Sequence, residues 1–272
     1  MRLAEALAAA RTAGIARLDA QLLLGHLLGR PRAWLIAHDD TELDPAQTEA
    51  LRQAFERRAA GVPLAYLTGE REFHGLVFRV GPAVLVPRPE TEILVDWALE
   101  LLAGGPAEVA DLGTGSGAIA IALLHRNRCA HVCASDASPA ALAQAGANAR
   151  RLGVDVEFVA GDWWQPLAGR YFDLVVSNPP YVAGNDPHLE ALAHEPRAAL
   201  TPEGDGLDAL RRIAAGSPAH LRPGGWLLLE HGHDQNHAVR ALLAQQGFEE
   251  IETRGDLAGL PRCTGGRRPA PP

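Results

Sequence analysis

Apolar residues recur every three or four positions along the first part of the chain, a spacing that predicts helices. The pattern is clearest from residue 3 to residue 10 and again over the segment AQLLLGHLLG, which Gly29 should end. A third helix is expected after Asp44, because an aspartate followed by a proline is typical of a helix start. Residues 1–68 are therefore predicted to form a small helical domain.

The segment from residue 69 to residue 86 follows a strand pattern. Two short runs of β-type residues flank His74 and Gly75, an arrangement typical of a hairpin. We expect this β-hairpin to link the helical domain to the remaining residues, 87–272.

From about residue 93 the pattern alternates between helices and strands. Helical patterns cover residues 93–104, 117–127, 139–153, 206–220 and 234–246. Strand patterns cover EVADLG (108–113), AHVCASD (130–136), VEFVAGD (156–162), FDLVVSN (172–178), WLLLEHG (226–232) and FEEIETR (248–254). Strands separated by helices predict an α/β domain, with a mostly parallel sheet and helices on both faces. The last segment, RCTGGRRPAPP (262–272), is too rich in Gly, Pro and Arg to predict an ordered element.

Composition narrows the class of protein. The chain has 272 residues, of which 47% are apolar and 21% are charged. No run of about 18 apolar residues occurs, so no membrane span is expected. Glu5, Arg11 and Arg17 interrupt the first apolar segment, which therefore reads as an amphipathic helix and not as a signal peptide. We expect a cytoplasmic protein.

The charged residues and cysteines exclude several kinds of chemistry. The formal net charge is −8, which disfavours nonspecific nucleic-acid binding. All 25 basic residues are arginine, and the absence of lysine excludes Schiff-base catalysis and a P-loop. Cys129, Cys133 and Cys263 form no paired framework, so we interpret them as reduced thiols and expect no metal site.

The segment D-L-G-T-G-S-G, residues 111–117, lies where an expected strand gives way to an expected helix. Its glycines let a ligand approach the backbone, and the start of the helix offers free N–H groups. Gly113, Gly115 and Ala118 also satisfy the dinucleotide-binding pattern G-x-G-x-x-A, with Asp136 about 20 residues further on. This segment alone therefore leaves an NAD-dependent dehydrogenase open.

Acidic residues at the ends of three expected strands favour a different ligand. Asp111 would repel a pyrophosphate but can face a cationic aminoacid-sulfonium group. Asp136 is placed to bind both hydroxyls of a ribose. Asp162 can accept a hydrogen bond from the amino group of an adenine, while Trp163 or Trp164 packs on its face.

The segment S-N-P-P-Y, residues 177–181, ends the fourth expected strand, where ligands of a parallel sheet bind. Its two prolines fix the backbone and remove two donors. The side-chain oxygen of Asn178 and the carbonyl of Pro179 are then two acceptors directed at one place, and Tyr181 offers an aromatic face. These groups fit a planar –NH2 group, either an amide or the exocyclic amine of a nucleobase.

Together these motifs resemble the amino-methyltransferases of the Rossmann-like AdoMet-dependent class. Three further segments, GEREFHG (69–75), PRPETE (87–92) and EPRAAL (195–200), resemble more specifically the peptide chain release factor glutamine methyltransferases, the PrmC/HemK family. The resemblance covers nearly the whole chain. It implies a seven-stranded, mostly parallel sheet preceded by a small helical domain and a hairpin.

The resemblance also implies a reaction: methylation of the glutamine of the Gly-Gly-Gln loop in class 1 release factors, with AdoMet as cofactor. The cofactor-binding residues that it implies are Gly113, Thr114, Gly115, Ser116, Gly117, Asp136, Trp163 and Asn178. The substrate-binding residues that it implies are Asn178, Pro179, Pro180 and Tyr181, with Asn178, Pro179 and Tyr181 as catalytic residues.

Alternatives remain open. A ribosomal-protein glutamine methyltransferase would share the site, and a nucleic-acid adenine-N6 methyltransferase would suit N-P-P-Y but not the acidic charge. An AdoMet-binding module without turnover leaves the acceptor motif unexplained.

We expect the helical domain to dock the protein substrate and the chain to be monomeric. Arg88, Glu90 and Glu92 could line the cleft or belong to a solvated loop. Glu195 and Arg197 could form a salt bridge that shapes the loop after the motif.

Overall fold

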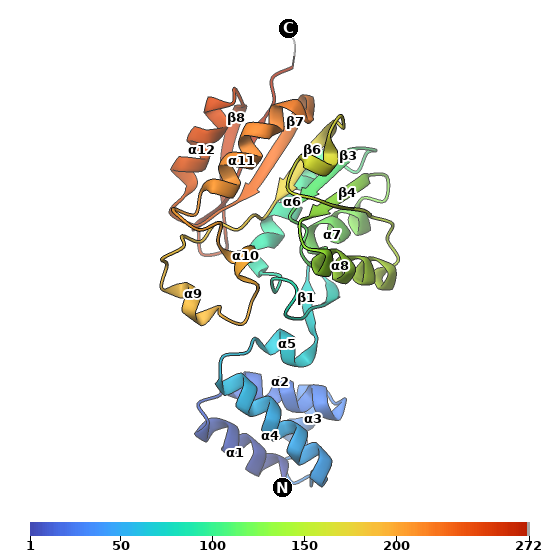
Figure 1. The fold of residues 1–272 in the computed structure, drawn as a ribbon. Helices are drawn as coiled ribbons and strands as arrows, with labels where there is room; N and C mark the ends of the chain where they lie inside the picture. The colour runs from blue at the N-terminus through green and yellow to red at the C-terminus, as the bar shows by residue number, and fades with distance from the viewer. Residues whose placement is uncertain (271–272) are drawn as a thin grey trace. The chain divides into compact units, whose positions relative to one another are not determined.

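The computed structural model describes residues 1–270. The chain divides into two compact units, one formed by Met1–Glu70 and the other beginning at Arg71 (Figure 1). No helix in the described part of the chain is both long enough and apolar enough to cross a membrane.

The first unit is a bundle of short helices around its own apolar core. Leu24 and Leu35 are among the fully buried side chains of this core. Asp44 caps a helix start as predicted, because its carboxylate accepts a hydrogen bond from the Gln47 N–H at 2.7 Å. The helices are α1 (Leu3–Thr12), α2 (Arg17–Leu28), α3 (Arg32–Ala37), α4 (Pro45–Ala59) and α5 (Leu64–Thr68).

The predicted hairpin is present. Strands β1 (Glu70–Phe73) and β2 (Leu76–Arg79) meet at His74 and Gly75, which both have positive φ. The Arg79 N–H donates a hydrogen bond of 2.9 Å to the Asn148 side chain of α8 (Pro139–Leu152). This bond holds the second strand of the hairpin against α8 within the second unit.

A seven-stranded sheet with the order β5-β4-β3-β6-β7-β9-β8 forms the centre of the second unit. β5, β4, β3, β6 and β7 are parallel, and β9 pairs antiparallel with both β7 and β8. The order reverses direction between β3 and β6, and ligands of such sheets bind at that point, outside the carboxyl ends of the strands. The strands are β3 (Glu108–Leu112), β4 (His131–Asp136), β5 (Glu157–Ala160), β6 (Phe172–Ser177), β7 (Leu221–Glu230), β8 (Glu249–Gly255) and β9 (Pro261–Arg267).

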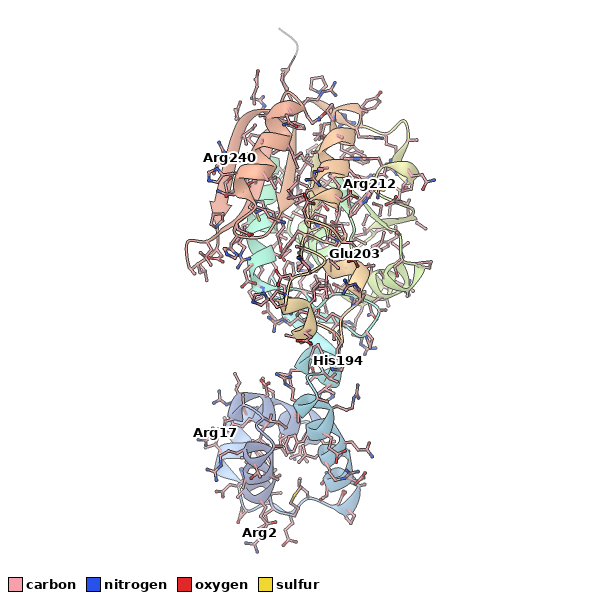
Figure 2. All side chains as sticks on the ribbon, turned by 60° about the vertical axis from the view of Figure 1, so that its left-hand side comes forward. Arg2, Arg17, His194, Glu203, Arg212 and Arg240 are labelled. Atoms are coloured by element: carbon pink, nitrogen blue, oxygen red, sulfur yellow. The ribbon has the colours of Figure 1, made fainter. Side chains whose placement is uncertain are left out.

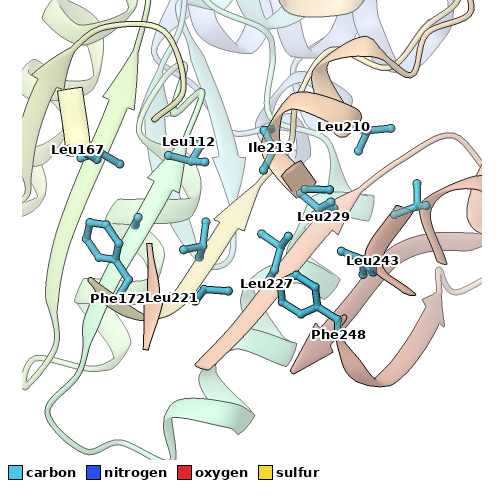
Figure 3. Packing of buried hydrophobic residues seen from close by; sticks show 14 of the residues in the cluster. Leu112, Leu167, Phe172, Leu210, Ile213, Leu221, Leu227, Leu229, Leu243 and Phe248 are labelled. Carbon is cyan, nitrogen blue, oxygen red and sulfur yellow. The ribbon is translucent and has the colours of Figure 1, made fainter. Parts of the chain in front are cut away.

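Helices cover both faces of the sheet, as predicted. α6, α7 and α8 pack side by side, and α11 packs beside α12. The α11 and α12 side is filled by Leu, Ile and Phe side chains (Figure 3). The helices of this unit are η1 (Pro89–Thr91), α6 (Glu92–Leu102), α7 (Ala118–Arg126), α8, η2 (Gln165–Leu167), α9 (His188–Ala191), α10 (Arg197–Leu200), α11 (Asp208–Gly216), η3 (Ser217–Ala219) and α12 (Asn236–Gln245).

The prediction that residues 262–272 form no ordered element is wrong for β9, which lies inside the sheet. A Cβ atom on Gly265 would lie 2.4 Å from the Leu228 side chain and 2.7 Å from the ring of Trp97 on α6. A Cβ atom on Gly266, which faces the other side of the sheet, would lie 3.0 Å from Phe248. The glycines are there because neighbouring side chains leave no room for another residue, and not because the chain is loose. Residues 271–272 lie outside the described part.

Candidate functional site

A cavity of about 270 Å³ opens where the strand order reverses, beside the ends of β3 and β6. Its walls include the glycine loop, the end of β4 and the start of the loop after β6. Two segments that are distant in sequence, within residues 83–91 and 196–199, complete the walls. Its lining includes Ala83, Val84, Leu85, Pro87, Arg88, Thr91, Gly113, Thr114, Gly115, Ser116, Asp136, Asp162, Trp163, Asn178, Pro180, Pro196, Ala198 and Ala199.

The glycine loop wraps one side of this cavity. Gly113, Gly115 and Gly117 have φ values of 74°, 56° and 83°, a region that favours glycine. A Cβ atom on Gly115 would meet no other atom within 4 Å, so its backbone borders open space. Gly117 does not line the cavity; a Cβ atom there would lie 2.8 Å from Ile121 inside the turn. Gly117 therefore shapes the loop, while Gly113 to Ser116 face the cavity.

Asp111 lies beneath this loop. It is fully buried, and one carboxylate oxygen accepts hydrogen bonds from the Thr114 hydroxyl at 2.7 Å and from the Ala120 N–H at 3.3 Å. Burial raises the pKa of Asp111 to about 7. The prediction that this carboxylate faces a sulfonium group is wrong, because the side chain points under the loop and braces it against the start of α7.

Asp136, at the end of β4, both supports the loop and lines the cavity. Its two carboxylate oxygens accept hydrogen bonds from the Gly115 N–H at 2.9 Å and from the Ser138 N–H at 2.8 Å. A carboxylate has about four lone-pair sites, so two remain for other donors. The side chain can therefore bind hydroxyl groups without releasing the loop.

Of the two tryptophans, Trp163 is the one that reaches the cavity. Its ring lies against Gly113, where a Cβ atom would be 3.3 Å from it. Trp164 stacks instead on His220, with ring centroids 4.7 Å apart, and donates a hydrogen bond to the carbonyl of Ile213. Asp162 also lines the cavity, and its carboxylate pairs with Arg212, which projects from α11 (Figure 2).

Asn178 and Pro180 of the N-P-P-Y motif line the cavity. The Asn178 Nδ2 donates a hydrogen bond to the hydroxyl of Thr91 at 3.1 Å. This bond directs the –NH2 end of the amide toward Thr91, and no described residue donates to Oδ1. Pro179 is buried beside the cavity, and the Tyr181 hydroxyl donates to Glu230 Oε1 at 3.2 Å, so neither belongs to the cavity wall.

The part of the wall formed by residues 83–88 and 196–199 depends on Glu195. Its carboxylate accepts a hydrogen bond from the Val86 N–H at 3.0 Å and pairs with Arg88. The predicted salt bridge between Glu195 and Arg197 is wrong. Arg197 begins α10 after Pro196 and pairs at 2.8 Å with Glu203, an exposed residue labelled in Figure 2. Arg88 therefore lines the cavity while Glu195 joins two distant segments of its wall.

The other junction residues have different places. Glu92 accepts a hydrogen bond from the His74 N–H at 2.9 Å and so closes the hairpin turn. Glu90 does not line the cavity. Sequence reasoning gave no separate role to Thr91, although it lies in the motif P-R-P-E-T-E, and none to Glu230. An acidic residue at the end of an apolar strand was the available signal for Glu230.

Comparison with known proteins settles the family. Residues 2–69 match the model of the PrmC N-terminal domain, and residues 91–208 match that of the methyltransferase small domain. A release factor glutamine methyltransferase of Bordetella pertussis is 53% identical over 257 residues, which cover 93% of this chain and 95% of that protein. One from Xylella fastidiosa is 52% identical over 268 residues, covering 97% of this chain and 98% of that protein. The chain belongs to the release factor glutamine methyltransferase family.

Solved structures agree with this family at the level of the fold. The T. thermophilus 16S rRNA N2 G1207 methyltransferase, in complex with AdoMet and guanosine, superimposes with a TM-score of 0.55 at 19% identity, over 73% of this chain and 49% of that one. The Rossmann-like methyltransferase fold that the resemblance implied is confirmed. The family relation also confirms AdoMet-dependent methyl transfer as the class of reaction.

Proposed function

We propose that this chain transfers a methyl group from AdoMet to the side-chain amide nitrogen of the glutamine in the Gly-Gly-Gln motif of peptide chain release factors. The observation that carries the proposal is the orientation of Asn178. Its –NH2 end is bound by Thr91, so its Oδ1 is left to accept a hydrogen bond in a cavity beside the glycine loop. The high identity to proteins named for this activity supports the same substrate.

The cavity suits the ribose and the adenine of AdoMet. Asp136 has free lone pairs for the ribose hydroxyls, and Trp163 offers an aromatic wall for the adenine. The open space beside Gly115 lets a ligand approach the loop backbone. When bound, AdoMet supplies a methyl group on a positively charged sulfur, which makes that methyl electrophilic.

The protein has to activate a poor nucleophile. An amide nitrogen shares its lone pair with the carbonyl, and the peptide rotation barrier of about 18–20 kcal/mol gauges the cost of losing that conjugation completely. The motif N-P-P-Y contains no group basic enough to remove an amide proton first. We therefore propose attack by the neutral amide nitrogen on the methyl carbon, so that an N–C bond forms while the S–C bond breaks and leaves its electron pair on sulfur. The nitrogen loses its proton to water during or after the transfer.

One acceptor of the motif, Asn178 Oδ1, lies in the cavity wall and can stabilise the charge that develops on nitrogen. We assign one amide hydrogen of the substrate to it, and this hydrogen bond strengthens as nitrogen becomes positive. The Pro179 carbonyl oxygen, predicted as the second acceptor, belongs to a residue that does not line the cavity. Preorganised contacts of this kind contribute about 3–4 kcal/mol each in comparable sites. Holding the nitrogen in line with the methyl group can contribute about 7–11 kcal/mol more. In this proposal Tyr181 fixes the end of the motif.

The helical unit has a separate role in the proposal. A single amide offers little basis for selecting one protein substrate, so a second contact with the release factor is needed. We assign that contact to residues 1–68, with 69–86 as the linking hairpin and 87–272 as the catalytic domain. The chain acts as a monomer, in the cytoplasm, where translation terminates.

Assays with three candidate methyl-accepting substrates distinguish this proposal from its alternatives. The chain is incubated with AdoMet labelled in the methyl group and with a release factor, ribosomes or DNA. We expect label in the release factor and none in a variant of it whose Gly-Gly-Gln glutamine is replaced by alanine. Label found mainly in ribosomal protein, or in DNA, would overturn the choice of substrate.

A further inference from the structure

The N-P-P-Y motif is a short segment that is held at both ends. Ser177, directly before it, pairs with Leu112 in the sheet, and its hydroxyl donates a hydrogen bond of 2.6 Å to the Leu112 carbonyl. At the other end, the Tyr181 carbonyl accepts a hydrogen bond of 2.9 Å from Gln235 Nε2. Gln235 directly precedes α12 and does not line the cavity. The second end of the motif is therefore held by a side chain 54 positions further along the sequence.

The two partners of the Gln235 amide fix its orientation. The Gly232 N–H donates a hydrogen bond of 2.9 Å to Gln235 Oε1, and a backbone N–H can only donate. The Tyr181 carbonyl can only accept, so the –NH2 end of the amide has to face it. Both ends of this side chain are thus in use. An ionised glutamate in the same place would offer acceptors alone.

The backbone of Gly206 packs closely against the same carbonyl group. A Cβ atom on Gly206 would lie 2.4 Å from the Tyr181 oxygen and 3.1 Å from Gln235 Nε2. The φ of Gly206 is 79°, a region that favours glycine. The close approach of Gly206 and the hydrogen bond from Gln235 together define the place of the carbonyl oxygen.

The two prolines make the segment between the held ends stiff. Each proline fixes its own φ and also restricts the residue before it, so Asn178 and Pro179 are confined to extended backbone. The few torsions that remain leave little room to absorb a shift of the Tyr181 carbonyl. Such a shift would therefore move Asn178 and Pro180, which line the cavity. A displacement of about 1 Å at a reacting centre can cost about 100-fold in rate.

We propose that Gln235 is a positioning residue for methyl transfer: by donating to the Tyr181 carbonyl it holds the far end of the N-P-P-Y motif, and through the two prolines it keeps Asn178 in its place in the cavity wall. The inference rests on the proposed function, because it depends on the acceptor role of Asn178 toward a substrate –NH2 group. Gln235 acts through the backbone of the motif and lies outside the cavity wall.

Two substitutions separate the two hydrogen bonds of Gln235. Gln235→Met keeps a side chain of similar length and removes both bonds, whereas Gln235→Glu keeps the acceptor for Gly232 but places an oxygen against the Tyr181 carbonyl. We expect each to lower kcat at least about 10-fold, while the Kd for AdoMet changes less than about 2-fold. Gln245→Glu makes the same change of charge at an exposed position at the end of α12 and should keep the wild-type kcat.

A double variant shows whether Gln235 acts through Asn178. Once the Asn178 amide is removed its placement no longer matters, so Asn178→Ala/Gln235→Met should be within about 3-fold of Asn178→Ala alone. A wild-type kcat in Gln235→Met or in Gln235→Glu, or losses that multiply in the double variant, would overturn the inference. If Gln235→Met does not fold, the comparison of Gln235→Glu with Gln245→Glu decides the question. A wild-type chain that leaves the release factor unmethylated would refute the proposed function itself, which is a different result.

Discussion

The Asn178 amide and the Thr91 hydroxyl are 87 positions apart in sequence and 3.1 Å apart in space, joined by a hydrogen bond in the cavity wall. Thr91 is held in η1 at the start of α6, and Asn178 follows β6, which pairs with β3 beneath the glycine loop. The acceptor is thus oriented by the fold before any substrate arrives. Groups fixed in advance lose less free energy to reorganisation during the reaction.

Removing the acceptor should damage turnover more than cofactor binding. Asn178→Ala deletes the oxygen that accepts the substrate hydrogen, so we expect kcat to fall at least about 100-fold. The Kd for AdoMet, measured by titration calorimetry, should change much less. Near-normal turnover in this variant would contradict the role assigned to Asn178.

Asp136→Ala should weaken AdoMet binding more than it lowers kcat, the reverse of Asn178→Ala. The variant loses the ribose acceptor and also the two loop N–H contacts, so AdoMet binding should weaken at least about 10-fold. Asp155→Ala removes an exposed acid two residues before β5 and is the matched control. An unchanged Kd for AdoMet in Asp136→Ala would count against the ribose assignment.

The interior glycine of β9 gives a test of the fold. Gly265→Ala forces a methyl group against Leu228 and Trp97, and overpacking of this kind costs about 1–3 kcal/mol. Urea unfolding should show a loss of that size. Gly81→Ala is the control, because a Cβ atom there meets nothing within 4 Å. Equal stability of the two variants would show that β9 is not packed as described.

The buried Asp111 predicts how stability depends on pH. Its pKa is raised from 3.8 to about 7 in the folded chain, so the folded chain keeps a proton that the unfolded chain loses. Its contribution to the free energy of unfolding is therefore full below about pH 4 and is lost as the pH rises to about 7. Between pH 4 and pH 8 the wild type should lose about 3–4 kcal/mol more than Asp111→Asn.

Urea unfolding at a series of pH values measures that difference. The two curves of unfolding free energy against pH should diverge as the pH rises through this range. Parallel curves would mean that Asp111 is ionised in the folded chain at low pH, against the effect of its burial.

Local patterns explain why much of this structure could be predicted. The glycine loop and the N-P-P-Y motif each follow a strand, so their place at one edge of a parallel sheet follows from strand order alone. The direction of a side chain is harder to predict. Asp111 was expected to face the ligand, yet the loop and the start of α7 bind it from inside.

Contacts between distant segments could not be predicted. Thr91 reaches Asn178, Glu195 reaches Arg88, and both pairs depend on how the second unit folds together. β9 escaped prediction for a different reason. Its glycines look like a flexible tail in the sequence, while in the sheet Gly265 is required by Trp97 and Leu228, and Gly266 by Phe248.

The most direct test of the central claim is peptide mapping by mass spectrometry. A release factor is incubated with AdoMet and either the wild-type chain or Asn178→Ala, and the peptide that contains Gly-Gly-Gln is sequenced. The account predicts one added methyl group on the glutamine side chain with the wild type and almost none with Asn178→Ala. A methyl group on another residue, or equal methylation by both proteins, would contradict it.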